Sequence, residues 1–216
     1  ATTTPTPLLV GARLHPSPAS GTGSAYPPEP PDSAGTDTTE TAKLIGSDCA
    51  EYGWFGGSVS ISGDTLVVGT YHDDDNGLNS GSAYLFKKPA AGWTDMTETA
   101  KLTASDGAED DLFGLVSISG DSVAVGALGD DDHGDWSGSA YLFEKPETGW
   151  TDKTETTKLT ASDSAEGDRF VRVSISGEAL VASAYYDGDG SGSAYVFYRF
   201  EPIAWLYLPV VLRSAP

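Results

Sequence analysis

The sequence predicts an all-β protein in which three similar four-stranded units follow one another. A segment of about 57 residues occurs three times, as the spacing of Trp93 and Trp150 shows. Each copy alternates apolar and polar residues with the period of a β-strand, and no segment keeps a helical period. The expected parts are an arm, three repeats and a tail, over residues 1–35, 36–93, 94–150, 151–198 and 199–216.

The arm holds most of the prolines, together with many serines, threonines and glycines. Because proline fixes φ and removes a backbone donor, this composition predicts an extended segment without a helix or a central strand. Two interpretations stay open: a flexible or O-glycosylated stalk, and an arm anchored on its own domain or on a neighbour. In the second, Leu8, Leu9 and Val10 form the expected anchor.

The first repeat shows the strand pattern most clearly. Val59–Ser62 alternates with period two, Gly63–Asp64 predicts a tight hairpin turn, and Leu66–Val68 continues as a buried run. Ala83–Phe86 predicts a third strand, and the threonine-rich stretch Trp93–Leu102 predicts a fourth. Four short strands in each repeat are typical of a propeller blade. Three blades are fewer than the four to eight that close a propeller.

Long motifs recur in the repeats. They include FGGSVSISGDTLVVG and FGLVSISGD, the phrase SGSAYLF, and the phrase KLTASD. These motifs resemble the FG-GAP repeat, the blade of integrin-type β-propellers, and above all its bacterial version. The resemblance covers residues 36–198 and implies a propeller-type blade for each repeat. It does not imply a function, because propellers serve many functions.

An acidic loop lies between the second and third expected strands of each repeat. Alternating carboxylates on a turn that contains glycine can converge on a Ca²⁺ ion, which takes six to eight oxygen ligands. In the resembled family this loop is a calcium site. The residues that match its first two positions are Asp73 and Asp75, Asp130 and Asp132, and Asp187 and Asp189.

These loops also depart from the family pattern. Glycine arrives one residue early, at Gly77 and Gly134, and the third loop is shorter. A weaker site or a solvated turn is therefore the alternative to calcium, since Asp, Asn and Gly favour turns by themselves. A second acidic group follows the Lys-Leu pair of each repeat, and we interpret it as a solvated rim. It consists of Asp48 and Glu51, Asp106 with Glu109 to Asp111, and Asp163 with Glu166 and Asp168.

Composition excludes several functions. A formal net charge of −20 disfavours nucleic acid and anionic lipid as partners. No catalytic motif or paired histidine occurs, so we expect no enzyme activity. The longest apolar run, residues 202–212, is about half the ~20 residues that a membrane helix needs. Asparagine occurs only at Asn76 and Asn79 and glutamine is absent, which is typical of a thermophile.

The two ends of the repeat region look complementary. In the register of the family, residues 36–45 are a spare fourth strand, and the third blade lacks its own. Joined between molecules, such ends make a head-to-tail contact that closes to a ring or extends as a filament. The tail is the expected donated strand. Its apolar residues are Ile203, Trp205, Leu206, Tyr207, Leu208, Val210, Val211 and Leu212.

Two alternatives to this assembly remain. The tail can fold back onto its own third blade, or the chain can be part of a longer propeller. Because the sequence starts at Ala1, we expect a processed, secreted protein. Our expectation is a structural subunit of an extracellular filament that polymerises with itself. The other functional reading is a calcium-dependent adhesion module that binds cell-surface proteins or glycans.

Overall fold

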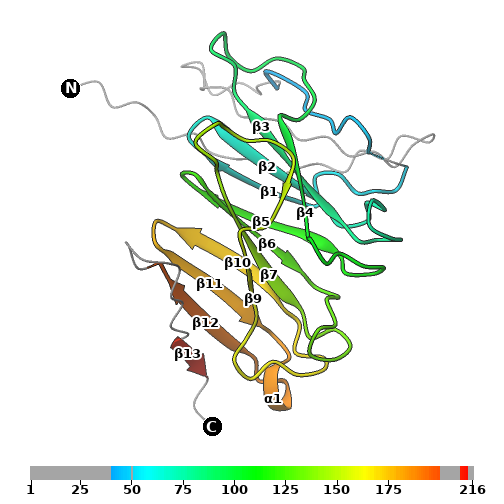
Figure 1. Cartoon of the computed structure of the whole chain (residues 1–216), viewed down its shortest axis with the longest axis vertical. Coiled ribbons are helices and arrows are strands. Elements are labelled where there is room, and N and C mark those ends of the chain that lie inside the picture. The colour runs from blue at the N-terminus through cyan, green and yellow to red at the C-terminus, as the bar shows by residue number, and fades with distance from the viewer. Residues whose placement is uncertain (1–39, 50, 200–209, 214–216) are drawn as a thin grey trace, which may run out of the picture.

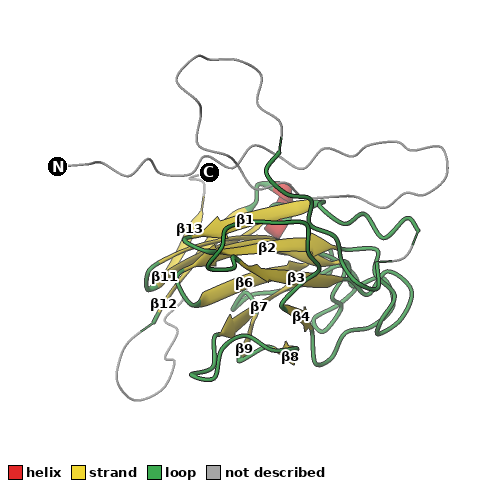
Figure 2. Cartoon of the chain, turned by 90° about the horizontal axis from the view of Figure 1, so that it is seen from above, coloured by secondary structure: helices red, strands yellow, loops and turns green. Residues whose placement is uncertain are grey.

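The protein is all-β in the computed structural model, which describes residues 40–49, 51–199 and 210–213 (Figure 1). Its described part contains three sheets and one helical turn, α1 (Asp187–Gly190). Figure 2 shows that strands and loops make up the rest of that part. The arm with Leu8, Leu9 and Val10, and the tail residues Ile203, Trp205, Leu206, Tyr207 and Leu208, lie outside the described residues.

The first sheet takes three strands from the first repeat and one each from the second and third repeats. Its antiparallel strands are β1 (Ser58–Ser62), β2 (Thr65–Thr70), β3 (Ser82–Lys87) and β4 (Ala100–Thr103), and β8 (Lys153–Thr154) adds to β4 in parallel. This confirms the four expected strands of the first repeat, with the fourth shorter than the stretch predicted for it. The turn between β1 and β2 contains a glycine at φ +57°, a conformation that glycine adopts without strain.

The second repeat forms a sheet of the same kind. It consists of β5 (Phe113–Ser119), β6 (Ser122–Ala127), β7 (Ser139–Glu144) and β9 (Thr157–Leu159). In the first two sheets the fourth strand therefore comes from the start of the following repeat, the segment that contains the Lys-Leu pair. This arrangement ties neighbouring repeats together through the backbone.

The third sheet takes its fourth strand from the tail. It consists of β10 (Phe170–Ser176), β11 (Ala179–Ala184), β12 (Ser193–Tyr198) and β13 (Val210–Arg213). The tail segment with Val210, Val211 and Leu212 thus pairs with β12 of its own chain. The sequence left this arrangement open as the alternative to a strand donated to another molecule.

The three sheets pack face to face in chain order (Figure 1). One apolar cluster fills the space between the first and second sheets, and another fills the space between the second and third. In each repeat the phenylalanine of the FG motif, which is followed by valine in the third repeat, packs edge-on against a tyrosine and a phenylalanine of the third strand. In the second repeat, Phe113 lies 5.4 Å from Tyr141 and 6.0 Å from Phe143 between ring centroids.

Serine side chains also join each sheet to the next through hydrogen bonds. Serine hydroxyls of β1 accept hydrogen bonds from β5, with Ser58 bonded to the Val116 N–H at 3.0 Å and Ser60 to the Ile118 N–H at 3.1 Å. Serines of β5 accept in the same way from β10, as Ser117 does from the Ile175 N–H at 3.1 Å. The spacing of 58 residues in each bond shows that both junctions use one geometry.

Candidate functional site: acidic clusters closed by lysine

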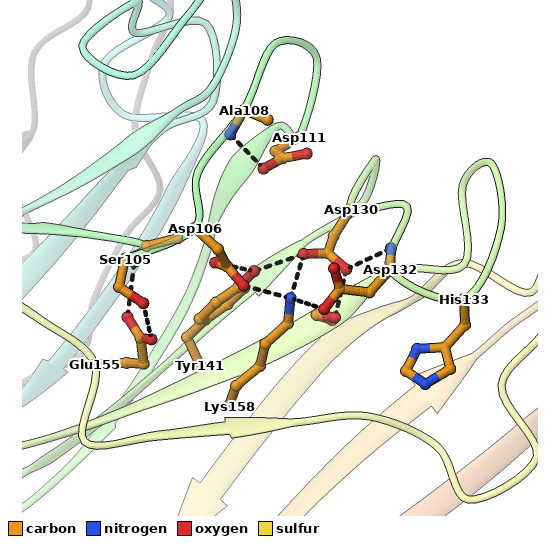
Figure 3. A network of polar contacts seen from close by, with 12 residues as sticks. Ser105, Asp106, Ala108, Asp111, Asp130, Asp132, His133, Tyr141, Glu155 and Lys158 are labelled. Atoms are coloured by element: carbon orange, nitrogen blue, oxygen red, sulfur yellow. Dashed lines mark hydrogen bonds and ion pairs between the residues drawn. The ribbon is translucent and has the colours of Figure 1, made fainter.

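Each repeat builds an acidic cluster at one end of its sheet. The cluster combines the acidic loop between the second and third strands, an aspartate that precedes the FG motif, and a tyrosine of the third strand. In the first two sheets a lysine of the fourth strand completes it. Figure 3 shows the second cluster, where the carboxylates surround the lysine ammonium.

In the second cluster, three carboxylates bind one ammonium group. Lys158 Nζ lies 2.7 Å from Asp106 Oδ2, 2.7 Å from Asp130 Oδ2 and 2.6 Å from Asp132 Oδ2. The Tyr141 hydroxyl lies 2.6 Å from Asp130 Oδ2 and 3.0 Å from Asp106 Oδ1. Asp130 is buried, whereas Asp106 and Asp132 are exposed. The ammonium therefore neutralises a carboxylate that has lost its contact with water.

The first cluster repeats this arrangement. Lys101 Nζ lies 2.9 Å from Asp48 Oδ2 and 2.8 Å from Asp73 Oδ2, and it also binds Asp75. The Tyr84 hydroxyl contacts Asp48 at 2.8 Å and Asp73 at 3.2 Å. The same geometry thus forms twice from equivalent residues.

The third cluster differs in its fourth strand. The Tyr195 hydroxyl lies 2.8 Å from Asp163 Oδ1 and 3.0 Å from Asp187 Oδ2, as in the other two clusters. The acidic loop here forms the helical turn α1, and the side chain of Asp189 lies outside the described residues. The register pairs Tyr84 with Lys101 and Tyr141 with Lys158, but it pairs Tyr195 with Val211. The lysine position of the third cluster is therefore a valine.

The charges in the second cluster stabilise each other. Burial favours the neutral form of Lys158, but its bonds to three aspartates outweigh burial and raise its pKa above the usual range. Burial likewise opposes the charge of Asp130, yet Lys158 and the hydroxyls of Tyr141 and Ser139 keep the pKa of that carboxyl below its ordinary value. Both groups therefore stay charged at neutral pH.

The acidic loops resemble calcium sites, and the structure tests whether their residues fit an ion. Oxygens of Asp106, Asp130 and Asp132 lie within 4.8 Å of one another, the arrangement a cation needs. The ammonium of Lys158 bonds to all three. A divalent cation at this point would have to displace a charged lysine from a buried carboxylate, and the same holds for Lys101 in the first cluster.

The sequence predicted part of this site. It grouped Asp73 with Asp75 and Asp130 with Asp132, and the structure brings each pair to one point. Asp48 and Asp106, interpreted as a solvated rim, are exposed, and they also belong to the clusters because each pairs with a lysine. The two lysines were missed, although a signal existed, since the Lys-Leu pair keeps its position relative to the FG motif in each repeat.

A separate surface feature lies between the second and third repeats. The Arg169 guanidinium lies 5.3 Å from the ring centroid of Trp136, 5.8 Å from that of Tyr185 and 4.7 Å from that of Tyr186. All three aromatic rings are partly exposed to solvent. Arg169, Trp136 and Tyr186, together with Asp135 and Glu166, line an open pocket with both aromatic and charged walls.

Asp111 is expected to make the stability of the protein depend on pH. Burial raises the pKa of this carboxyl to about 6, against a bond from the Ala108 N–H, and repulsion from Asp130 adds to the rise. The pKa of Asp111 is higher in the folded protein than in the unfolded chain. Its contribution to the stability of the fold is therefore fully present below pH 3.8 and is lost as the pH rises through about 6. We expect Asp111→Asn to melt at a higher temperature than the parent at pH 7, and the difference to vanish near pH 4.

Thermal melts between pH 4 and pH 8 measure this effect. Asp121→Asn is the control, because it also removes one carboxylate, but one that lies in an exposed ion pair with Lys145. Parallel curves for the parent and Asp111→Asn would contradict the assignment.

The three repeats match the model of a known protein family. A family model described as FG-GAP repeat matches the chain three times, over residues 38–86, 96–143 and 153–197. No curated protein matches the chain. Among the described residues, no helix has the length and apolar character needed to cross a membrane.

Proposed function

The chain belongs to the FG-GAP repeat family, and from this premise we propose that it is a secreted, non-catalytic structural protein whose copies assemble head to tail. FG-GAP repeats are typical of extracellular or surface proteins and suggest a β-propeller-like module. The observation that carries the proposal is the junction between repeats, by which we mean the packing of one face of a sheet against the facing side of the next sheet. It occurs twice inside the chain with one geometry, and at the two ends of the described repeat region its two halves are less buried than their counterparts inside the chain.

The third sheet presents one half of the junction. Val181 is 38% exposed, whereas Val67 and Ala124, at the same position in the first two sheets, are fully buried against the next sheet. Ser174 and Ser176 are also exposed, and their counterparts Ser117 and Ser119 accept hydrogen bonds from the next repeat. The described part of the chain has no sheet beyond this face.

The first sheet presents the other half. Val59 and Ile61 of β1 are half-buried, whereas Val116 and Ile118, at the same positions in β5, are only 8% and 6% exposed. By the geometry of the inner junctions, the N–H of Ile61 would donate to Ser174 of a second copy. Burying this apolar surface contributes about 25 cal/mol per Å².

One residue opposes an identical junction between copies. Gly69 and Gly126 let the next repeat approach so closely that an added Cβ would lie 1.7 Å from Gly114 O and 1.9 Å from Val171 O, respectively. The third sheet has Ser183 at this position. A junction between copies must therefore be wider there than the inner junctions, and we expect it to be weaker and reversible.

Sedimentation velocity and negative-stain electron microscopy test the proposal. We expect the purified protein to form head-to-tail oligomers whose size increases with concentration. Val181→Glu should abolish them without changing the melting temperature, because the charge lies on the free face. Leu78→Glu is the control, since Leu78 is 56% exposed in the first acidic loop.

Ser183→Gly provides a variant with the opposite effect. It removes the side chain that holds the copies apart, so oligomers should appear at a concentration about tenfold lower. A monomer at every concentration, for the parent and for Ser183→Gly, would contradict the proposed function.

The second candidate is a ligand-binding module, as FG-GAP repeats often are, and many of them bind calcium. The partly exposed pocket around Arg169 favours it, because aromatic faces beside charged groups can bind glycans or protein side chains. The cluster of Asp106, Asp130 and Asp132 is the candidate calcium site for this function. It requires that chelation with EDTA lower the melting temperature of the parent protein.

A further inference from the structure

We propose that β13 occupies the place of a strand from a second copy, the segment Ala42–Leu44, and that Lys43 of that copy completes the third acidic cluster. The tail strand β13 then blocks the edge of β12, and it must detach from β12 before a second copy can bind there. This inference rests on the proposed head-to-tail function and names the strand and the charge that make the contact.

The strand registers show which position in the third sheet this segment would occupy, namely that of the fourth strand. The fourth strand of the first sheet pairs Lys101 with Tyr84 and Leu102 with Ala83. The second sheet repeats this pairing with its own Lys-Leu pair. In the third sheet, the tail puts Leu212 opposite Ala194 and Val211 opposite Tyr195. The tail thus reproduces the leucine of the missing strand but not its lysine.

The segment Ala42–Leu44 has the sequence expected of a fourth strand in the third sheet. Its letters, Ala-Lys-Leu, are those of residues 100–102 in β4. The Lys43 N–H donates to Asp95 Oδ1 at 2.8 Å, just as the Lys101 N–H donates to Asp152 Oδ1 at 2.8 Å. The segment is therefore already held in the arrangement that β4 has.

One edge of this segment has a partner and the other does not. Leu44 forms a parallel bridge with Met96, which matches the pairing of β4 with β8. On the opposite edge, where β4 pairs with β3, no strand of the described part of the chain lies beside it. An unpaired strand edge is a template for pairing with another chain.

The side chains of the segment point in the directions the contact needs. Ala42 and Leu44 are 2% and 0% exposed, and Leu44 packs into the apolar cluster of the first sheet, whereas Lys43 is exposed. The equivalent lysine side chain in β4 is only 11% exposed, because three carboxylates surround it. In the third cluster, Asp163 and Asp187 meet at the Tyr195 hydroxyl, as Asp106 and Asp130 meet at the Tyr141 hydroxyl, and they are the counterparts of two of the three carboxylates that bind Lys158.

A disulfide between β12 and β13, called the lock below, tests the inference because it can be formed and then reduced. Cysteines at Ala194 and Leu212, which are register partners, are introduced together with Cys49→Ser so that no other thiol remains. Oxidation should fix β13 on β12 and keep the protein monomeric. Reduction should restore the oligomers formed by the Cys49→Ser parent, as measured by sedimentation velocity.

Lys43→Met gives an independent readout. It should raise the concentration needed for assembly at least about tenfold, while the monomer melts at the parent temperature because the side chain is exposed. Lys88→Met is the control, since Lys88 forms only an exposed ion pair with Asp64. This control should assemble like the parent.

The outcomes separate the inference from the function. If the oxidised lock assembles as well as the reduced form, or if Lys43→Met assembles like the parent, the inference is wrong and the head-to-tail function still stands. If neither the reduced lock nor the parent assembles at any concentration, the proposed function itself is wrong, and the inference with it.

Discussion

Gly126→Ala is expected to destabilise the protein by about 3 kcal/mol or more, because it drives a side chain into the backbone of the next sheet. A Cβ at this position would lie 1.9 Å from Val171 O and 3.0 Å from Val171 Cγ2. Neither neighbour can move easily, since Val171 is itself buried between the second and third sheets. The sheets would have to separate, and the apolar cluster between them would lose contacts.

The matched control for this variant is Ser183→Ala. Ser183 occupies the same position in the third sheet, which no further sheet of the described chain covers, so the change should alter stability by only about 0.5 kcal/mol. Urea unfolding followed by tryptophan fluorescence gives both free energies. Equal losses for the two variants would show that the close approach at Gly126 does not matter.

The second large effect is expected from Lys158→Met. This change removes the ammonium and leaves the buried carboxylate of Asp130 beside two other carboxylates, a situation that costs about 3 kcal/mol or more. For a chain of this size, the melting temperature should fall by roughly 6 to 12 °C. Lys145→Met, which loses only an exposed ion pair with Asp121, should change stability by less than about 1 kcal/mol.

The same variant tests what the acidic cluster prefers. Without the ammonium, the oxygens of Asp106, Asp130 and Asp132 remain within reach of one cation, so millimolar Ca²⁺ should restore part of the lost stability. The parent should respond far less, because its lysine already fills the cluster. A parent whose melting temperature rises with Ca²⁺ as much as that of the variant would favour the calcium-dependent candidate instead.

Much of the fold was readable from the sequence because it is local and repeated. The alternation in Val59–Ser62, the glycine turn after it and the run Leu66–Val68 predicted β1 and β2, and the structure confirms them. The FG-GAP resemblance is confirmed by three family matches. Local patterns predict strands well because side-chain alternation and turn chemistry depend on neighbouring residues.

The site was only partly readable. The sequence grouped Asp130 with Asp132, which are two residues apart, but it separated them from Asp106 and did not include Lys158. Asp106 and Lys158 are 52 residues apart and meet only because β9 pairs with β7. A charge run in sequence shows where carboxylates are, but the cation that neutralises them comes from a different strand.

The sequence by itself determined the β class, the three repeats, the turns and the concentration of negative charge in recurring loops. Only the tertiary structure decided that a lysine closes the first two clusters, that Gly126 is a contact between sheets, and that Val210–Arg213 pairs with its own third sheet. The physical reason is that strand propensity and turns are set by residues next to one another. The partner of a strand edge or a buried charge is set by which distant segments the packed sheets bring together.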